Sequence, residues 1–251
     1  MKRLLLIGAV LLAACGQSHP SAPSSADTAA SHLEPLIANG SGAQCTKDGV
    51  WCATANTDAT TFAFSYKNKQ VASYQLTDGG REIWTQIIRT RRSDGGEDAL
   101  VGISRNDQQA YSGGGGQALL VSLYAVSSAT PAPTHPALTF PAAASIDIRA
   151  CFSEADQRAR RDACSDQYTF NGMLSLDAST TPPKLSLTTD ATTFPAGISR
   201  NSDNTHALQA SDLRTVHDPV CSYHRVFTWD AASQTYKPDA PLPPCTDYLE
   251  P

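Results

Sequence analysis

The sequence lacks the short patterns that identify many hydrolases. It contains neither Gly-x-Ser-x-Gly nor His-Glu-x-x-His, the patterns of α/β-hydrolases and of zinc proteases. It also lacks Cys-x-x-Cys, and its other cysteine spacings do not fit a zinc site. After residue 14, no apolar run approaches the about 20 residues that a membrane-spanning helix needs, so we expect the rest of the chain to be soluble. These absences predict a protein that binds rather than an enzyme.

An excess of basic residues is also missing. The 19 lysines and arginines are outnumbered by 24 aspartates and glutamates, which gives a formal net charge of −5. Residues 1–14 contain two of the basic residues, Lys2 and Arg3, and no acidic one, so their removal would lower the net charge from −5 to −7. Because an acidic chain repels a phosphate backbone, we expect no binding of nucleic acid.

The N-terminus resembles the signal peptide of bacterial lipoproteins. Two basic residues precede an apolar run over residues 4–12, which is too short to cross a bilayer. The run leads into Leu12-Ala13-Ala14-Cys15, which matches a lipobox. The resemblance implies cleavage after residue 14 and lipid on the Cys15 thiol, which would anchor the chain at the periplasmic face of a membrane. Gly16 after the cysteine favours the outer membrane. The alternatives are an ordinary signal peptide and a short buried helix.

Residues 16–43 are rich in serine, alanine, proline and glycine. Such a composition buries too little apolar surface to offset the entropy of ordering the chain. We therefore expect residues 15–43 to form the lipidated cysteine and a disordered linker, with His19 and His32 in solvent. A flexible linker of this length would hold the domain some tens of ångströms from the membrane.

Six cysteines remain besides Cys15, and an oxidising compartment favours their pairing in disulfides. The sequence does not fix the connectivity, but the cysteines come in three close pairs. In the first pair, an Asp48-Gly49 turn would place Cys45 directly across from Cys52 in a hairpin. The spacing favours the pairs Cys45–Cys52, Cys151–Cys164 and Cys221–Cys245.

Short strand-like segments dominate the chain from Cys45 onward. Residues 60–66 alternate aromatic with small or polar residues, and Gly, Asn, Asp and Pro clusters separate this segment from the next ones. Such spacing is typical of an antiparallel sandwich or barrel. We expect residues 44–251 to form one all-β, sandwich-like domain with further strands at 71–76, 82–89, 99–103, 118–126, 168–176, 184–188 and 223–229.

One segment, residues 151–164, has the pattern of a short helix. Ser153 can cap its N-terminus, and the pairs Glu154–Arg158 and Asp156–Arg160 have the favourable i,i+4 order. The segment is either a solvated helix closed by its disulfide or a basic patch for an acidic partner, and its internal acids favour the first interpretation.

Four consecutive glycines lie between two strand-like segments, preceded by Tyr111 and Ser112. Walker A loops continue with Gly-Lys-Ser/Thr, whereas Gln117-Ala118 follows here, so a phosphate-binding loop is excluded. The run is either a flexible hairpin connection or a protruding loop whose bare backbone can enter a narrow cleft. The residues of that candidate loop are Tyr111, Ser112, Gly113, Gly114, Gly115 and Gly116.

Residues 82–126 combine strand, Asp-Gly turn, strand, Ser-Gly-rich loop and strand. This order resembles the periplasmic inhibitors of I-type lysozyme, and still more the immunity lipoproteins that neutralise lysozyme-like effectors of bacteria-killing type IV secretion systems. In these inhibitors a Ser-Gly-x-Tyr loop fills the glycosidase cleft, where side-chain hydroxyls bond the catalytic carboxylates. Ser112 and Gly113 match the start of the motif, Gly115 stands at its tyrosine position, and Tyr111 precedes the serine. The resemblance implies that this loop binds a lysozyme-like peptidoglycan hydrolase.

The same family has a calcium loop of the pattern Asp-x-Asn-x-Asp-Gly-x-x-Glu. In this chain Asp94, Gly95 and Asp98 match, whereas Thr90 and Arg92 replace the first two ligands. Calcium needs six to eight oxygen ligands. The resemblance therefore leaves two alternatives, a calcium site at Asp94 and Asp98 or an Asp-Gly hairpin turn.

Three functions follow from these patterns. The first is inhibition of a lysozyme-like peptidoglycan glycosidase by a periplasm-facing lipoprotein, with no cofactor apart from the calcium just considered. The second is a structural or assembly lipoprotein of the outer membrane. The third is a secreted hydrolase, because three histidines lie near aspartates in the sequence and permit a triad. These residues are His206, His217, His224, Asp212, Asp218 and Asp230.

Overall fold

The computed structural model describes residues 31–40 and 42–251. In chain order the elements are β1 (Ser31–Pro35), β2 (Ile37–Ala38), β3 (Gln44–Cys45), β4 (Trp51–Ala55), β5 (Thr61–Tyr66), β6 (Lys69–Gln75), β7 (Arg81–Arg91), β8 (Glu97–Tyr111), β9 (Gly114–Ser127), β10 (Leu138–Arg149), α1 (Glu154–Ala159), β11 (Ser165–Asp177), β12 (Lys184–Phe194), the 3₁₀ helix Ala210–Asp212, β13 (Val216–His217), β14 (His224–Asp230), β15 (Thr235–Pro238) and α2 (Thr246–Leu249). Strands make up 53% of the chain and helices 6%, which confirms the predicted all-β class.

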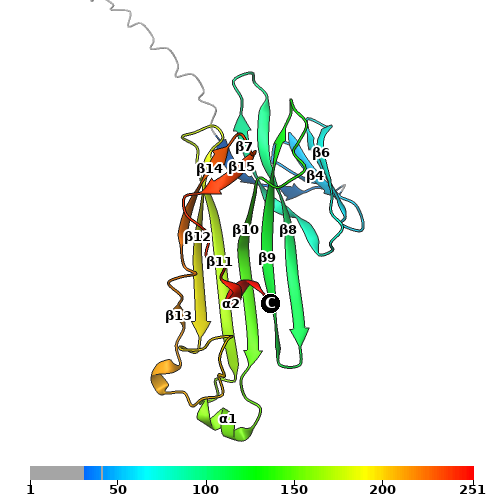
Figure 1. Ribbon diagram of the computed structural model, residues 1–251. Helices are drawn as coiled ribbons and strands as arrows, with labels where there is room; N and C mark the ends of the chain where they lie inside the picture. The colour runs from blue at the N-terminus through cyan, green and yellow to red at the C-terminus, as the bar shows by residue number, and fades with distance from the viewer. Residues whose placement is uncertain (1–30, 41) are drawn as a thin grey trace, which may run out of the picture.

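The strands form two antiparallel sheets. The larger sheet has the order β1-β7-β8-β9-β10-β11-β12-β14-β15, with β13 paired to β12, and the smaller has the order β2-β3-β4-β5-β6. The long strands β8 to β12 run the length of the molecule, and the smaller sheet lies beside one end of them (Figure 1). The turn between β8 and β9 lies at the other end, as does α1 (Figure 1). The fold is therefore a sandwich at one end and a longer sheet that extends beyond it.

The first core lies between the two sheets. In β5, Phe62 and Phe64 are buried while their neighbours are partly exposed, as expected when alternate residues of a strand face opposite sides. Trp51 of β4 joins them, and β8 contributes Val101 and Ile103 from the larger sheet. The predicted alternation over residues 60–66 therefore marks the inner face of the sandwich.

A second core lies on the opposite face of the larger sheet. Leu100 of β8 packs there with Val121, Leu123 and Phe140, and with Leu187 of β12. Since Leu100 and Val101 are neighbours in the same strand, β8 is buried on both faces at this point. This explains why residues 99–103 are almost continuously apolar rather than alternating.

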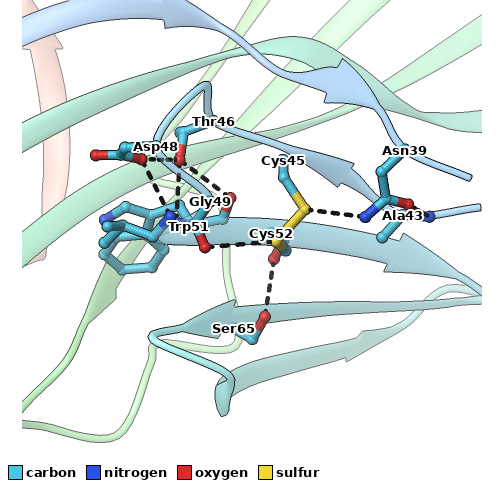
Figure 2. Close-up of a disulfide and its surroundings, with 10 residues drawn as sticks. Asn39, Ala43, Cys45, Thr46, Asp48, Gly49, Trp51, Cys52 and Ser65 are labelled. Carbon is cyan, nitrogen blue, oxygen red and sulfur yellow. Dashed lines mark hydrogen bonds between the residues drawn. A yellow bond between two sulfur atoms is a disulfide. The ribbon is translucent and has the colours of Figure 1, made fainter. Parts of the chain in front are cut away.

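The turn between β3 and β4 confirms the predicted Asp-Gly hairpin. Cys45 lies directly across from Cys52, and the chain reverses between Thr46 and Gly49 (Figure 2). One Asp48 carboxylate oxygen accepts hydrogen bonds from the Thr46 hydroxyl at 2.6 Å and from the Val50 backbone N–H at 3.0 Å. The turn thereby fixes the direction in which the other oxygen of Asp48 points.

That second oxygen binds Arg89, a buried arginine of β7 that joins the two sheets. The Arg89 guanidinium donates to Asp48 at 2.8 Å, to Glu34 of β1 at 2.8 Å, and to both oxygens of Glu97 at 2.8 and 2.9 Å. The indole N–H of Trp51 also donates to Glu97, at 2.9 Å. We call Arg89, Glu34, Asp48 and Glu97 the Arg89 cluster.

The cluster changes the pKa of two of its carboxylates. Burial by itself would raise the pKa of Asp48, but the hydrogen bonds from Thr46, Arg89 and Val50 outweigh burial and lower it to about 2. For Glu97, burial likewise raises the pKa, but the hydrogen bonds from Arg89 and Trp51 keep it below its ordinary value. The folded protein therefore favours the charged form of both groups.

The three predicted disulfides are all present. The Cα atoms lie 4.1 Å apart in Cys45–Cys52, 4.9 Å apart in Cys151–Cys164 and 5.7 Å apart in Cys221–Cys245. Such distances are normal for disulfides or slightly shorter. Each disulfide closes a short local segment, which is why spacing along the chain was sufficient to predict it.

The boundary of the predicted linker at residue 43 is wrong. Residues 31–35 form β1, which pairs with β7 along its whole length, and Ile37–Ala38 form β2. His32 is exposed, as predicted. The apolar Leu33 and Leu36 supply the burial that the composition of the whole segment concealed. Cys15, His19 and the predicted signal peptide lie outside the described residues. None of the described helices is long and apolar enough to cross a bilayer.

Candidate functional site: the tip of the β8–β9 hairpin

The candidate loop of residues 111–116 is shorter than predicted. Tyr111 of β8 pairs with Gly114 of β9, so that Ser112 and Gly113 alone form the turn. Gly114, Gly115 and Gly116 belong to β9 and pair with β8 on one side and with β10 on the other. The prediction of a four-glycine loop is therefore wrong, because three of the glycines lie inside the sheet.

Close approach of the strands explains these glycines. A Cβ atom on Gly114 would lie 2.2 Å from the carbonyl oxygen of Asp147 in β10, and the residue has a φ of +153°. A Cβ atom on Gly115 would lie 2.9 Å from the carbonyl oxygen of Gln109 in β8. Any larger residue would push the backbones apart, so the glycines hold the end of the hairpin against β10.

The turn presents two hydroxyl groups to solvent. Tyr111 has 41% of its surface exposed, and Ser112 is exposed as well. Within the described part of the chain neither hydroxyl has a hydrogen-bond partner. The carbonyl oxygen of Gly113 accepts a 2.6 Å hydrogen bond from the backbone N–H of Arg149, which ties the turn to the end of β10. The hydroxyls therefore project from a braced turn.

Phe152 adds an aromatic side chain to the same end of the molecule. The residue is 64% exposed, and the centre of its ring lies 5.3 Å from the guanidinium carbon of Arg149. Because the backbone N–H of Arg149 also bonds Gly113, Arg149 contacts both Phe152 and the β8–β9 turn. We call Tyr111, Ser112, Gly113, Arg149 and Phe152 the tip surface. Phe152 and Arg149 were not predicted from the sequence, although an aromatic residue in an otherwise polar helical segment is a usable signal.

The segment around α1 keeps Phe152 in place. Ser153 caps the helix by accepting a 3.1 Å hydrogen bond from the backbone N–H of Asp156, as predicted. The Asp156 carboxylate accepts a bond of 3.0 Å from the backbone N–H of Phe152. The bond from Phe152 and, after it, a hydrogen bond between the Ser153 side chain and the carboxylate lower the pKa of Asp156. The exposed aromatic ring is thus attached to a fixed backbone.

The predicted helix is shorter than residues 151–164, and one of its two predicted ion pairs is wrong. Glu154 and Arg158 approach to 3.4 Å on the surface. Arg160 does not pair with Asp156, because its side chain is fully buried and binds Asp166 of β11. Arg160 also donates to the carbonyl oxygens of Ala163, at 2.9 Å, and of Asn204. Through these partners, the buried guanidinium of Arg160 attaches the C-terminal end of α1 to β11.

Asp94 and Asp98 bind an arginine in place of calcium. Arg92 donates to both oxygens of Asp94 at 3.0 and 3.1 Å, to Asp98 at 3.0 Å and to the Ser127 hydroxyl at 2.9 Å. Its positive charge lies between the two carboxylates, where it would repel a calcium ion. Among the described residues no group of three or more acidic, histidine or cysteine side chains could hold a metal. The geometry therefore fits the alternative, an Asp94-Gly95 hairpin turn.

The histidines do not form the triad that the sequence permitted. His217 approaches Asp190 at 2.7 Å, and His224 approaches the Thr188 hydroxyl at 3.0 Å. Asp218 instead accepts a bond of 3.2 Å from the Tyr248 hydroxyl. His217 and His224 thus have other partners than the aspartates beside them in the sequence.

Comparisons with protein-family models, with curated proteins and with solved structures found no match to this chain.

Proposed function

We propose that this protein is a periplasm-facing lipoprotein that inhibits a lysozyme-like peptidoglycan glycosidase, as an immunity protein does, by placing its tip surface in the cleft of the enzyme. The observation that carries the proposal is the pair of exposed, unpartnered hydroxyls of Tyr111 and Ser112 on a braced turn. The resemblance to the inhibitors of I-type lysozyme supports the same assignment through Ser112 and Gly113.

The chemistry of the target explains why hydroxyls suit this role. A glycosidase presents two carboxyl groups, about 5–5.5 Å apart in retaining enzymes and further apart in inverting ones. Hydroxyl groups can donate to such carboxylates, and hydrogen bonds to charged groups contribute about 1.5–3 kcal/mol each. Gly113 has no side chain, so the turn is narrow enough for a groove built for sugar. The tip contains no glycosidic bond, so the enzyme cannot cleave it.

The position of the tip suits a protein anchored at its N-terminus. Ser31, the first described residue, pairs with Thr90, and Thr90 pairs with Asp98 at the start of β8. From Asp98 to Tyr111 the strand spans about 40 Å, at ~3.3 Å per residue. The tip surface therefore lies at the far end of the molecule from the start of β1. Lipid on Cys15 would leave the tip directed away from the membrane.

An inhibition assay tests the proposal. The mature protein is mixed with lysozyme-type enzymes, including any encoded by a neighbouring gene, and hydrolysis of peptidoglycan is followed. We expect inhibition of at least one enzyme, and inhibition at least about a hundredfold weaker for Tyr111→Phe/Ser112→Ala, since this variant removes two hydroxyls and keeps the backbone. Ser73→Ala, which removes an exposed hydroxyl from β6, is the matched control and should inhibit normally. Full activity of every enzyme at saturating inhibitor would exclude the proposal, as would equal inhibition by the double variant.

A further inference from the structure

A cleft lies at the end of the molecule opposite to the tip surface. The β7–β8 turn, the connection between β9 and β10, the β11–β12 turn and the β14–β15 hairpin enclose a volume of about 520 Å³. Such a volume is within the range of typical ligand sites, about 300–1,000 Å³. Leu100 and Ala125 form part of its floor. Its walls contain one tryptophan and four prolines, Trp229, Pro131, Pro133, Pro182 and Pro183.

A row of polar residues crosses the larger sheet at the mouth of this cleft. Ser31 pairs with Thr90, Thr90 with Asp98, and Asp98 with Ser127. Residues that pair directly in antiparallel strands project from the same face, and Thr90, Asp98 and Ser127 line the cleft. The Ser31 hydroxyl lies 2.8 Å from that of Thr90. Ser31 therefore lies beside a residue that lines the cleft, and the chain that precedes it joins the fold next to the cleft.

The sequence before Ser31 contains prolines at a spacing that suits such a cleft. Residues 19–23 read His-Pro-Ser-Ala-Pro, so two prolines are three positions apart. Segments of this kind favour the polyproline II conformation, in which three residues complete a turn and the backbone carbonyls stay unpaired. Grooves that bind them are lined with aromatic residues. In the cleft, Trp229 offers an indole N–H that makes no hydrogen bond to any described residue.

We propose that residues 19–23 of this chain dock in the cleft as a polyproline II segment, with the backbone carbonyls facing the indole N–H of Trp229. Seven residues separate Pro23 from Ser31, and this connection can span up to about 26 Å when extended, so residues 19–23 can reach a cleft that opens beside Ser31. A connection this short gives an effective concentration in the millimolar range, so even a weak site is occupied.

Charge at the rim agrees with this occupant. Arg92, Asp94 and Asp98 together carry a net charge of −1 beside the mouth. The docking segment contains no acidic residue, and His19 becomes positive when protonated. The segment and the rim therefore do not repel each other at neutral pH. Docking would shorten the free connection between Cys15 and the fold from residues 16–30 to residues 16–18.

The test follows the indole N–H resonance of Trp229 by NMR in the lipid-free chain with Cys15→Ser. Trp229→Phe assigns the resonance, and Trp51 and Trp84 serve as internal references. We expect Pro20→Ala/Pro23→Ala to move the Trp229 resonance, and an excess of a synthetic peptide of residues 16–30 to move it back. Ser25→Ala, outside the proline pair, should leave the resonance in place. A second variant with residues 19–23 replaced by glycine and serine should shift it in the same way.

Identical Trp229 resonances in the wild type and in both variants would overturn the proposal. If the Trp229 resonance is identical in the wild type and both variants but shifts when chitobiose is added, the proposal is also overturned, since the cleft would then be a saccharide site. Neither result depends on inhibition of a glycosidase, so the outcome is separate from that of the proposed function.

Discussion

Replacing Arg89 with methionine removes the positive charge that three carboxylates share. The methionine fills most of the same volume, but Glu34, Asp48 and Glu97 then face one another without a cation between them. The Arg89 side chain is only 8% exposed and that of Glu97 only 12%, so water compensates poorly for the loss. Removing one partner of a buried ion pair typically costs about 3–5 kcal/mol. We expect Arg89→Met to lower the free energy of unfolding at pH 7 by about 3–4 kcal/mol.

The pH dependence of this loss is a stricter test than its size. Asp48 has a pKa of about 2 in the folded protein, below its value of 3.8 in an unfolded chain. A lowered pKa stabilises the fold above about pH 4, and this stabilisation is lost as the pH falls towards 2. The shift corresponds to roughly 2.5 kcal/mol at about 1.36 kcal/mol per unit. The Asp48 side chain is 47% exposed, so screening by solvent reduces this contribution to about 1 kcal/mol.

Unfolding by urea, followed through Trp fluorescence at pH 7, 4 and 2.5 with the disulfides intact, measures both effects. The difference between wild type and Arg89→Met should shrink by up to about 1 kcal/mol between pH 7 and pH 2.5, because Glu97 contributes with the same sign as Asp48. Arg91→Met is the matched control, since Arg91 is an exposed neighbour in β7, and should change stability by less than about 0.5 kcal/mol. A loss below 1 kcal/mol at pH 7, or a difference that does not vary with pH, would refute the reasoning.

Three further predictions concern other parts of the chain. Gly114→Ala should lower the free energy of unfolding by more than 1 kcal/mol in urea titrations, because its Cβ would lie 2.2 Å from the Asp147 carbonyl oxygen, whereas Gly40→Ala meets no atom within 4 Å and should be nearly neutral. Cys15→Ser should move the protein from the membrane fraction to the soluble periplasmic fraction in cell fractionation, and an unchanged distribution would contradict lipidation. Calcium at millimolar concentration should leave the thermal midpoint of the wild type unchanged, because Arg92 lies between Asp94 and Asp98; a midpoint that rises with calcium would contradict this.

The features that the sequence predicted correctly are local. The three disulfides connect cysteines at most 24 positions apart, and the Asp48-Gly49 and Asp94-Gly95 turns depend on adjacent residues. The Ser153 cap is equally local, because its partner is three residues away. The all-β class followed from many short alternating segments, each of which needed no knowledge of its partner strand. Such features are decided by the chain over one turn or one hairpin.

The tertiary structure decided what depends on strand pairing. The glycine run looks like a loop in the sequence, yet β10 pairs with Gly114–Gly116 and turns it into strand. Leu33 and Leu36 look like isolated apolar residues in a linker, yet pairing of β1 with β7 makes that segment part of the sheet. In each case the deciding partner lies far away in the sequence.

Partners brought together by the fold also decided which charged groups pair and which residues form the tip surface. Arg160 has four acidic residues within six positions, and the burial of Asp166 beside it selected the partner. Phe152 and Tyr111 belong to one surface because Arg149 ends β10 beside the β8–β9 turn. The sequence by itself determined the all-β class, many of the strands, the disulfides and the turns, because these depend on neighbouring residues. Only the register between distant strands decided which hydroxyls, charges and aromatic rings meet at each end of the molecule.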